Sequence, residues 1–91
     1  MNLSVTIPDS LKQQYIERRK VDLQKLEAAL KQSDFSVVIR VGHQLKGNAV
    51  TFGFDELEMI GVALEGAGDA ADLKAAQEAL GSFAAWVSSR S

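Results

Sequence analysis

The sequence predicts an all-α protein, folded as an antiparallel up-down bundle of four helices. Ala, Leu, Glu, Lys and Gln, which favour helix, dominate the chain after its single proline, Pro8. Apolar residues recur at three- and four-residue steps, and no stretch alternates with period two for long enough to build a sheet. No repeat, low-complexity tract or linker divides the chain, so we expect residues 1–91 to form one domain.

The first helix is predicted to begin between Thr6 and Ser10 and to end near Gln32. Pro8 suits its first turn, because a proline there loses no helical hydrogen bond. The residues expected to face inward are Leu11, Tyr15, Leu23, Leu26 and Leu30. At roughly 24 residues, or ~36 Å, this helix should be the longest, and its N-terminal part is expected to extend over one end of the bundle.

The second helix is predicted to run from Phe35 to Phe52, with Ser33 or Asp34 as its N-cap. Gly53 stands where a helix commonly ends in the left-handed conformation. The inward stripe of this helix consists of Phe35, Val38, Gly42, Leu45, Ala49 and Phe52.

The third helix should begin at Asp55, which can cap it while Phe54 packs on Met59, and it should end at Gly66-Ala67-Gly68. Asp69 can cap the fourth helix. The inward residues are expected to be Leu57, Ile60 and Leu64 in the third helix, and Leu73, Ala76, Leu80, Phe83 and Val87 in the fourth. Trp86 is expected to pack at the edge of the core, and the inward Gly42 and Gly61 should allow close helix packing.

Composition and charge exclude several classes of function. The net charge of −2 disfavours nucleic acid as a partner, since phosphate neutralisation needs a basic surface. The chain has no cysteine, which excludes disulfides and thiolate metal sites. No apolar run approaches the ~20 residues of a membrane span, and the N-terminus lacks the pattern of a signal peptide. We therefore expect a cytoplasmic protein.

His43 is the residue whose position most clearly indicates a chemical role. Each residue turns a helix by about 100°, which places His43 roughly 150° from the centre of the inward stripe. The imidazole should therefore face solvent or a partner. Ile39 and Val50 lie within about 40° of it, and with Arg40 they form a candidate docking surface.

Two neighbours of His43 strengthen this interpretation. Gly47 lies one turn further on the same side, where glycine costs about 1 kcal/mol relative to alanine. It leaves room beside the imidazole for a partner to approach. Lys46 follows His43 by three residues, so the two side chains are neighbours on the helix surface. Its ammonium group can pair with the oxygens of a phosphoryl group.

The stretch His43-Gln44-Leu45-Lys46-Gly47-Asn48-Ala49 resembles the motif of histidine-containing phosphotransfer (HPt) domains. That motif reads His, any residue, Leu/Met/Ile, Lys, Gly, a small residue, and Ala or Ser. Thr51-Phe52-Gly53-Phe54 resembles the continuation of the motif, and the resemblance covers nearly the whole chain. Asn48 departs from the pattern, where Ser is more usual, and this departure concerns the local hydrogen bonding.

The resemblance implies a four-helix bundle and a phosphoryl carrier in a two-component phosphorelay. Nε2 of His43 would accept a phosphoryl group from a phospho-aspartate of a response-regulator receiver domain and pass it to another receiver. Lys46 would neutralise the phosphoryl charge, Gly47 would give clearance, and Gln44 would hydrogen-bond near the phosphoryl group. A hybrid histidine kinase is a further candidate partner.

The same resemblance implies no cofactor of its own, because the receiver would supply the Mg²⁺. The chain shows no glycine-rich nucleotide loop, so it is not expected to be an enzyme that phosphorylates itself from ATP. The acids nearest to His43 in the sequence, Asp34 and Asp55, are not placed by helical spacing to act as its base. Phosphoryl transfer needs mainly positioning and charge neutralisation, so this is no obstacle.

Three other functions are alternatives, and the sequence disfavours two of them. The chain could be a helical interaction module that binds a receiver or kinase without being phosphorylated. A metal site is disfavoured, because one histidine and no cysteine supply too few ligands for a transition metal. A hydrolase is disfavoured, because no Ser/His/Asp arrangement or paired inward carboxylates appear, and a small bundle leaves little room for a cavity.

Overall fold

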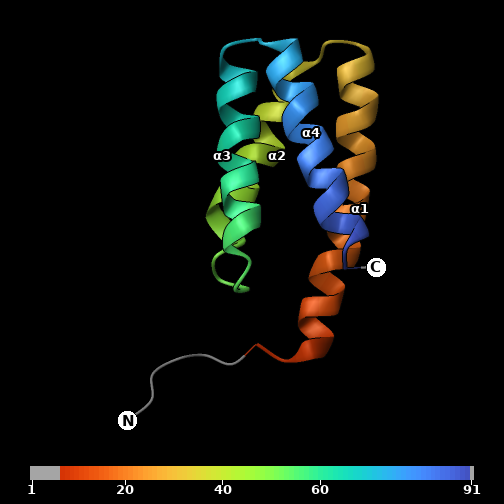
Figure 1. The fold of residues 1–91 in the computed structure, drawn as a ribbon, viewed down its shortest axis with the longest axis vertical. Coiled ribbons are helices and arrows are strands. Elements are labelled where there is room, and N and C mark those ends of the chain that lie inside the picture. Colours follow the sequence, from red (N-terminus) through yellow and green to blue (C-terminus); the bar gives the residue numbers. More distant parts are fainter. Residues whose placement is uncertain (1–6, 91) are drawn as a thin grey trace.

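The computed structural model describes residues 7–90, which form four helices connected by short turns (Figure 1). The helices are α1 (Asp9–Lys31), α2 (Phe35–Asn48), α3 (Asp55–Asp69) and α4 (Leu73–Ser88). Each helix reverses the direction of the one before it, and α2 and α4 both pack against α1 and α3. The predicted antiparallel up-down bundle is therefore confirmed. The single-domain prediction also covers residues 1–6 and 91, which lie outside the described part.

The helix α1 begins at Asp9, within the predicted interval, of which Thr6 lies outside the described residues. Its first turns extend beyond the lower end of the other helices in Figure 1, as the length of the helix predicts. Leu11 lies on this extension and is exposed, so its predicted inward position is wrong. The other predicted inward residues are at least partly buried, namely Tyr15, Leu23, Leu26 and Leu30.

The helix α2 ends at Asn48, four residues earlier than predicted. The chain then turns, with the Phe54 N–H donating to the Ala49 carbonyl at 2.9 Å and the Gly53 N–H donating to the Val50 carbonyl at 2.9 Å. Gly53 has a φ of 84°, so the predicted left-handed residue is confirmed. The turn brings Phe52 and Phe54 back over the end of the core, which a continued helix would not do.

The start of α3 differs from the prediction. Asp55 is the first helical residue, and Phe54 occupies the capping position without a side-chain cap. The Phe54 ring packs against Tyr15 and Trp86. Met59 is left 72% exposed, so the predicted contact between Phe54 and Met59 is wrong.

The end of α3 also lies beyond the predicted glycines. The helix continues through Gly66 and Gly68 to Asp69, and Asp72 rather than Asp69 caps α4 by accepting from the Ala75 N–H at 3.0 Å. A Cβ on Gly68 would lie 2.6 Å from Cγ1 of Ile39. This glycine therefore permits helix packing inside α3 instead of ending the helix.

One apolar core runs between the four helices. Its fully buried large side chains are Trp86, Phe83, Leu26, Leu45, Leu57, Leu64, Val38 and Val41. The inward predictions for α3 are confirmed, and in α4 only Leu73 is exposed. Trp86 is more deeply buried than an edge position implies, at 2% exposure. No helix within residues 7–90 is long and apolar enough to cross a membrane.

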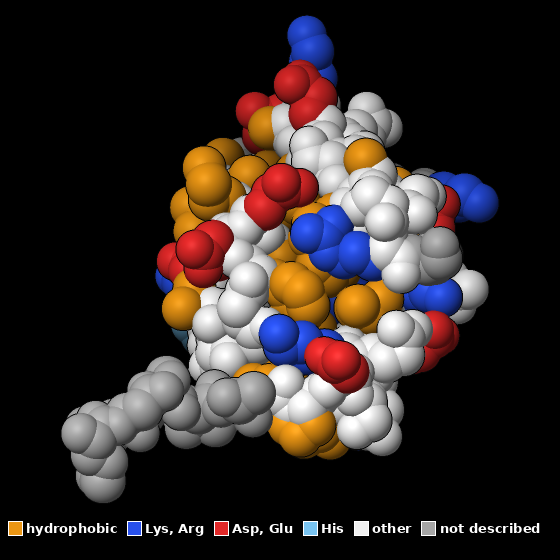
Figure 2. Space-filling view, turned by 60° about the horizontal axis from the view of Figure 1, so that its bottom comes forward, with side chains coloured by type: hydrophobic (Ala, Val, Ile, Leu, Met, Phe, Trp, Pro, Cys, Tyr) orange, Lys and Arg blue, Asp and Glu red, His pale blue; other side chains and the backbone are white. Residues whose placement is uncertain are grey.

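Aromatic side chains close the lower end of the core. Tyr15 stacks on Phe52 with ring centroids 4.3 Å apart, and Phe54 meets Trp86 edge to face at 5.1 Å. Two arginines cover the cluster: Arg19 stacks on Tyr15, and Arg90 stacks on Trp86. Figure 2, which brings this end forward, shows hydrophobic side chains at its centre with Lys and Arg side chains beside them.

Candidate phosphoryl-acceptor site

The site lies on α2, whose register is fixed at its first turn. Oδ1 of Asp34 accepts from the Ser36 N–H at 3.1 Å and from the Ser36 hydroxyl at 2.6 Å. The predicted cap is thereby confirmed, and the hydrogen bond from the Ser36 side chain lowers the pKa of Asp34. Because the helix starts at Phe35, Val38, Gly42 and Leu45 face inward and His43 does not.

His43 stands on the outer face of α2. Its side chain is 71% exposed, so the predicted orientation away from the core is confirmed. The ring nitrogen Nδ1 lies 2.8 Å from Oε2 of Glu65 on α3. The other ring nitrogen, Nε2, has no hydrogen bond to any described residue.

Two glycines bring α3 close enough for this contact. A Cβ on Gly42 would lie 2.5 Å from the Glu65 backbone nitrogen and 2.8 Å from the Gly61 carbonyl oxygen. A Cβ on Gly61 would lie 2.7 Å from the backbone nitrogen of Lys46. The two backbones are thus in direct contact, which confirms the close packing predicted for these glycines. As a result, the Glu65 side chain reaches the outer face of α2.

Glu65 joins His43 and Lys46 in one hydrogen-bonded group. Nζ of Lys46 donates to Oε1 of Glu65 at 2.6 Å, while Oε2 faces the imidazole. The glutamate side chain is only 19% exposed. The hydrogen bond from Lys46, followed by the one from His43, lowers the pKa of Glu65, which keeps this carboxylate ionised near neutral pH.

The carboxylate determines which imidazole nitrogen is free to react. An ionised carboxylate only accepts hydrogen bonds, so Nδ1 of His43 carries the hydrogen in this contact. In a neutral imidazole the other nitrogen, Nε2, then holds the lone pair. The lone pair of Nε2 is therefore not used by any described residue, on a side chain that is 71% exposed.

The surface next to the imidazole is open at Gly47. A Cβ built on this residue would meet nothing within 4 Å, so the glycine is not required for packing. Gln44 is exposed, and its side chain forms no hydrogen bond with a described residue. Within residues 7–90, no group of three or more His, Asp or Glu side chains is arranged to hold a metal ion.

The family model of the Hpt domain matches residues 10–89, which is nearly the whole chain. The chain belongs to the Hpt domain family. The four-helix bundle and the resemblance of the histidine motif agree with this membership. No curated protein and no solved structure gave a significant match to the chain.

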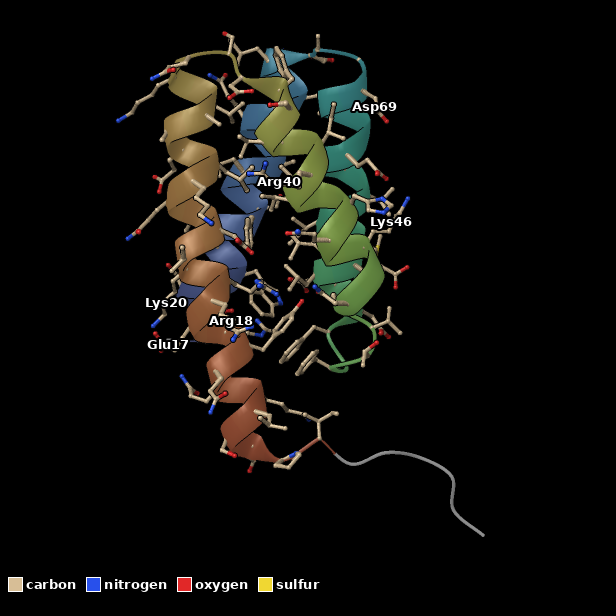
Figure 3. All side chains as sticks on the ribbon, turned by 180° about the vertical axis from the view of Figure 1, so that it is seen from behind. Glu17, Arg18, Lys20, Arg40, Lys46 and Asp69 are labelled. Carbon is tan, nitrogen blue, oxygen red and sulfur yellow. The ribbon has the colours of Figure 1, made fainter. Side chains whose placement is uncertain are left out.

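The residues predicted to dock a partner on this Hpt domain differ in accessibility. Val50 and Arg40 are exposed. Ile39 is only half-buried because it packs against Gly68 of α3, so it contributes less surface than its angular position suggests. Figure 3 shows Arg40 on the α1 side of α2 and Lys46 on the α3 side. Their roles in docking stay predictions.

Asn48, where this Hpt domain departs from the usual motif, joins α2 to α1. Its Oδ1 accepts a hydrogen bond from the Tyr15 hydroxyl. Tyr15 also stacks on Phe52, and its pKa is raised, mainly by burial. The amide side chain thus ties the end of α2 to α1.

Glu65 is the site residue that sequence analysis missed. The search for a partner of His43 considered the acids nearest in the sequence, Asp34 and Asp55. The glycines gave part of the missing signal, since both were predicted to allow close packing. Gly42 packs against Gly61 and also against the backbone of Glu65, one turn further along α3. This register brings Glu65 beside His43, and it is a property of the packed pair of helices.

Proposed function

We propose that this Hpt domain is a phosphoryl carrier of a two-component phosphorelay, with His43 as the acceptor. Members of the family act in histidine phosphotransfer. The observation that carries the proposal is the arrangement of the two ring nitrogens: Nδ1 is held by Glu65, and Nε2 is unpaired on a side chain that is mostly exposed. The proposed donor is a phospho-aspartate on a receiver domain, and a hybrid histidine kinase is a further candidate source.

The transfer step follows from the free lone pair on Nε2. This lone pair attacks phosphorus, so that the P–N bond forms while the P–O bond to the receiver aspartate breaks. The aspartate leaves as a carboxylate, and the imidazole gains positive charge. The carboxylate of Glu65 stabilises that charge through Nδ1, without any rearrangement of the site. A second receiver reverses the step with its own aspartate.

Lys46 and Gly47 have supporting roles in this proposal. Nζ of Lys46 is bound to Glu65 in the free domain, one turn from His43. Rotation of its flexible side chain brings the ammonium group to the phosphoryl oxygens, whose charge it partly neutralises. Gly47 leaves the space in which the receiver approaches, and the Mg²⁺ is bound by the receiver.

A transfer assay tests the proposal directly. Incubation with a phosphorylated receiver should move an acid-labile, base-stable label to the domain, and His43→Gln should abolish the label. Phosphoramidate, a small donor that needs no docking, should label His43 in the same way. A domain that binds receivers but takes no label from either donor would instead be the non-phosphorylated interaction module. Label retained on His43→Gln would show that another residue is the acceptor.

A further inference from the structure

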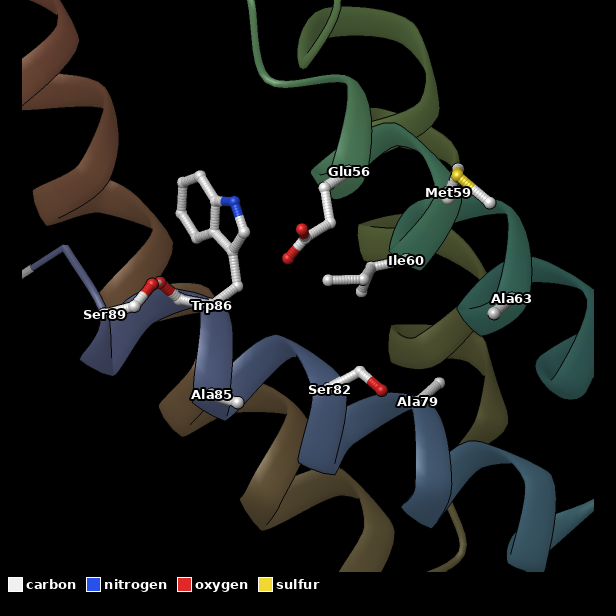
Figure 4. Close-up of a pocket in the computed structure, with 9 residues that line it drawn as sticks. All are labelled: Glu56, Met59, Ile60, Ala63, Ala79, Ser82, Ala85, Trp86 and Ser89. Carbon is white, nitrogen blue, oxygen red and sulfur yellow. Dashed lines mark hydrogen bonds between the residues drawn. The ribbon is translucent and has the colours of Figure 1, made fainter.

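A second surface of the molecule has the features of a binding site. A groove of about 580 Å³ runs between α3 and α4 (Figure 4), and His43 is not among the residues that line it. Met59 and Glu65 are six residues apart on α3, so they point about 120° away from each other. The groove is therefore separate from the phosphoryl-acceptor site.

The lining of the groove is mainly apolar. On α3 it consists of the exposed Met59 together with Ile60 and Ala63, and on α4 small residues such as Ala85 form the facing wall. The small side chains of α4 allow close approach of another backbone. Exposed apolar surface of this kind, bordered by polar residues, is typical of protein interaction sites.

Trp86 provides a second, independent observation at the lower end of the groove. Its side chain is 2% exposed, and its indole Nε1 is buried without a hydrogen-bond acceptor among the described residues. Figure 4 shows the indole nitrogen on the side of the ring that faces Glu56. Buried polar groups are normally paired, so an unpaired indole N–H beside the groove is an unusual feature of this end of it.

The charge of this side of the molecule indicates the kind of occupant. The first turn of α3 is acidic, with Asp55, Glu56 and Glu58, and the helix has no Lys or Arg. The only basic residue of α4, Lys74, lies in its first turn, ~18 Å from Trp86 along the helix. Arg90 is close to the groove, but its guanidinium stacks on the Trp86 ring. Glu56 lines the groove itself.

The dimensions of the groove suit a short helix. Its α3 wall runs from Glu56 to Ala63 and its α4 wall from Ala79 to Ser89. These segments are ~10 and ~15 Å long, which corresponds to two to three helical turns. An amphipathic helix lies in such grooves with its apolar side down and its polar side at the rim.

We infer that the groove between α3 and α4 binds a basic amphipathic helix of another protein, independently of His43. The apolar side of that helix packs on Met59 and Ala63, and its Lys or Arg side chains face Glu56 and the acidic first turn of α3. A phosphoryl carrier with this second surface can hold a partner while His43 remains accessible.

The probe for this inference is a synthetic Leu/Lys peptide of about four helical turns, or ~14 residues, with the leucines on one side. Trp86 is the only tryptophan of the chain, so its fluorescence reports occupation of the groove. Calorimetry and backbone NMR shifts should place the peptide at Met59, Ala63 and Ala85 and leave His43 unchanged. A scrambled peptide of the same composition and a peptide with Glu in place of Lys should bind at least about tenfold more weakly.

Chain variants complete the experiment. Met59→Lys and Ala63→Arg should each weaken binding about tenfold or more, while Val21→Lys, at a 48% exposed apolar position on α1, should not. Both groove positions are exposed, so the fold should be kept, which circular dichroism verifies. Equal binding by all three variants, or peptide shifts centred on His43, would overturn the inference. Self-association that Met59→Lys abolishes would also overturn the inference, because a second copy of the chain would then be the occupant. Loss of phosphoryl transfer from a receiver in Met59→Lys would overturn it as well, because the groove would then not act independently of His43.

Discussion

Oε2 of Glu65 on α3 lies 2.8 Å from Nδ1 of His43 on α2, beside the point where Gly42 and Gly61 bring the two helices together. This contact makes the two imidazole nitrogens of His43 different, because it involves only Nδ1. One nitrogen is held by a carboxylate that is itself paired with Lys46, and the other has no partner among the described residues. The hydrogen bonding of a histidine on one helix therefore depends on the packing of the neighbouring helix.

Glu65→Gln should slow phosphoryl transfer to His43 about 10- to 100-fold, the loss found when the hydrogen-bond partner of a metal-binding histidine is removed. The amide can still accept from Nδ1, but it no longer stabilises positive charge on the ring. The measurement is the initial labelling rate with phosphoramidate and with a phosphorylated receiver. Both rates should fall together, because the defect lies in the imidazole and not in docking. Glu58→Gln, on the same helix, is the matched control, and an equal loss there would contradict a specific role of Glu65.

The stability of the bundle should depend on the ionisation of Glu65. Contacts with Lys46 and His43 lower the pKa of Glu65 below its ordinary value of 4.5 in the folded state. A lowered pKa contributes stability that is fully present above the ordinary value and is lost as the pH falls through the folded value. The free energy of unfolding of the wild type should therefore approach that of Glu65→Gln on going from pH 7 to about pH 3. Urea denaturation measures the free energies of unfolding of the wild type and of Glu65→Gln. A difference between them that stays constant from pH 7 to about pH 3 would contradict the prediction.

Gly61→Ala should destabilise the domain by about 1–3 kcal/mol, as overpacking of a close contact does. The added Cβ would lie 2.7 Å from the backbone nitrogen of Lys46 and 2.8 Å from the Gly42 carbonyl oxygen, so α2 and α3 must move apart. The separation should also carry Glu65 away from His43 and slow transfer.

Gly66→Ala on the same helix is the control, since a Cβ there meets nothing within 4 Å. It should stabilise the domain by about 0.5–1 kcal/mol, the ordinary gain from replacing a glycine inside a helix. Urea denaturation of both variants decides the matter, and similar changes of the same sign would show that the contact between the helices is not tight.

The sequence predicted features that depend on one helix, and it missed those that depend on two. Helical periodicity alone placed His43 outward and Gly42 inward, and both positions are confirmed. The contact with Glu65 depends on the axial register of α3 against α2, which no pattern within either helix specifies. The end of α3 was misplaced for the same reason, because Gly68 resembles a terminating residue until Ile39 is seen against it. Phe54 likewise packs on Tyr15 and Trp86, which belong to distant segments.

Gly47→Arg should block phosphoryl transfer from a receiver while leaving the fold intact. Apart from its chain neighbours and the backbone of its own helix, a Cβ at this position would meet nothing within 4 Å, so the arginine side chain can extend over the surface next to His43 without disturbing the core. It occupies the space through which a receiver must bring its aspartate to Nε2. Phosphoramidate is small and should still label His43, so the ratio of the two labelling rates separates lost access from a damaged acceptor. Gly47→Ala, which adds only a methyl group, should transfer normally and be more stable by about 0.5–1 kcal/mol. Receiver transfer to Gly47→Arg at the wild-type rate would mean that clearance at this position is not needed, and an equal loss with both donors would place the defect in His43 itself.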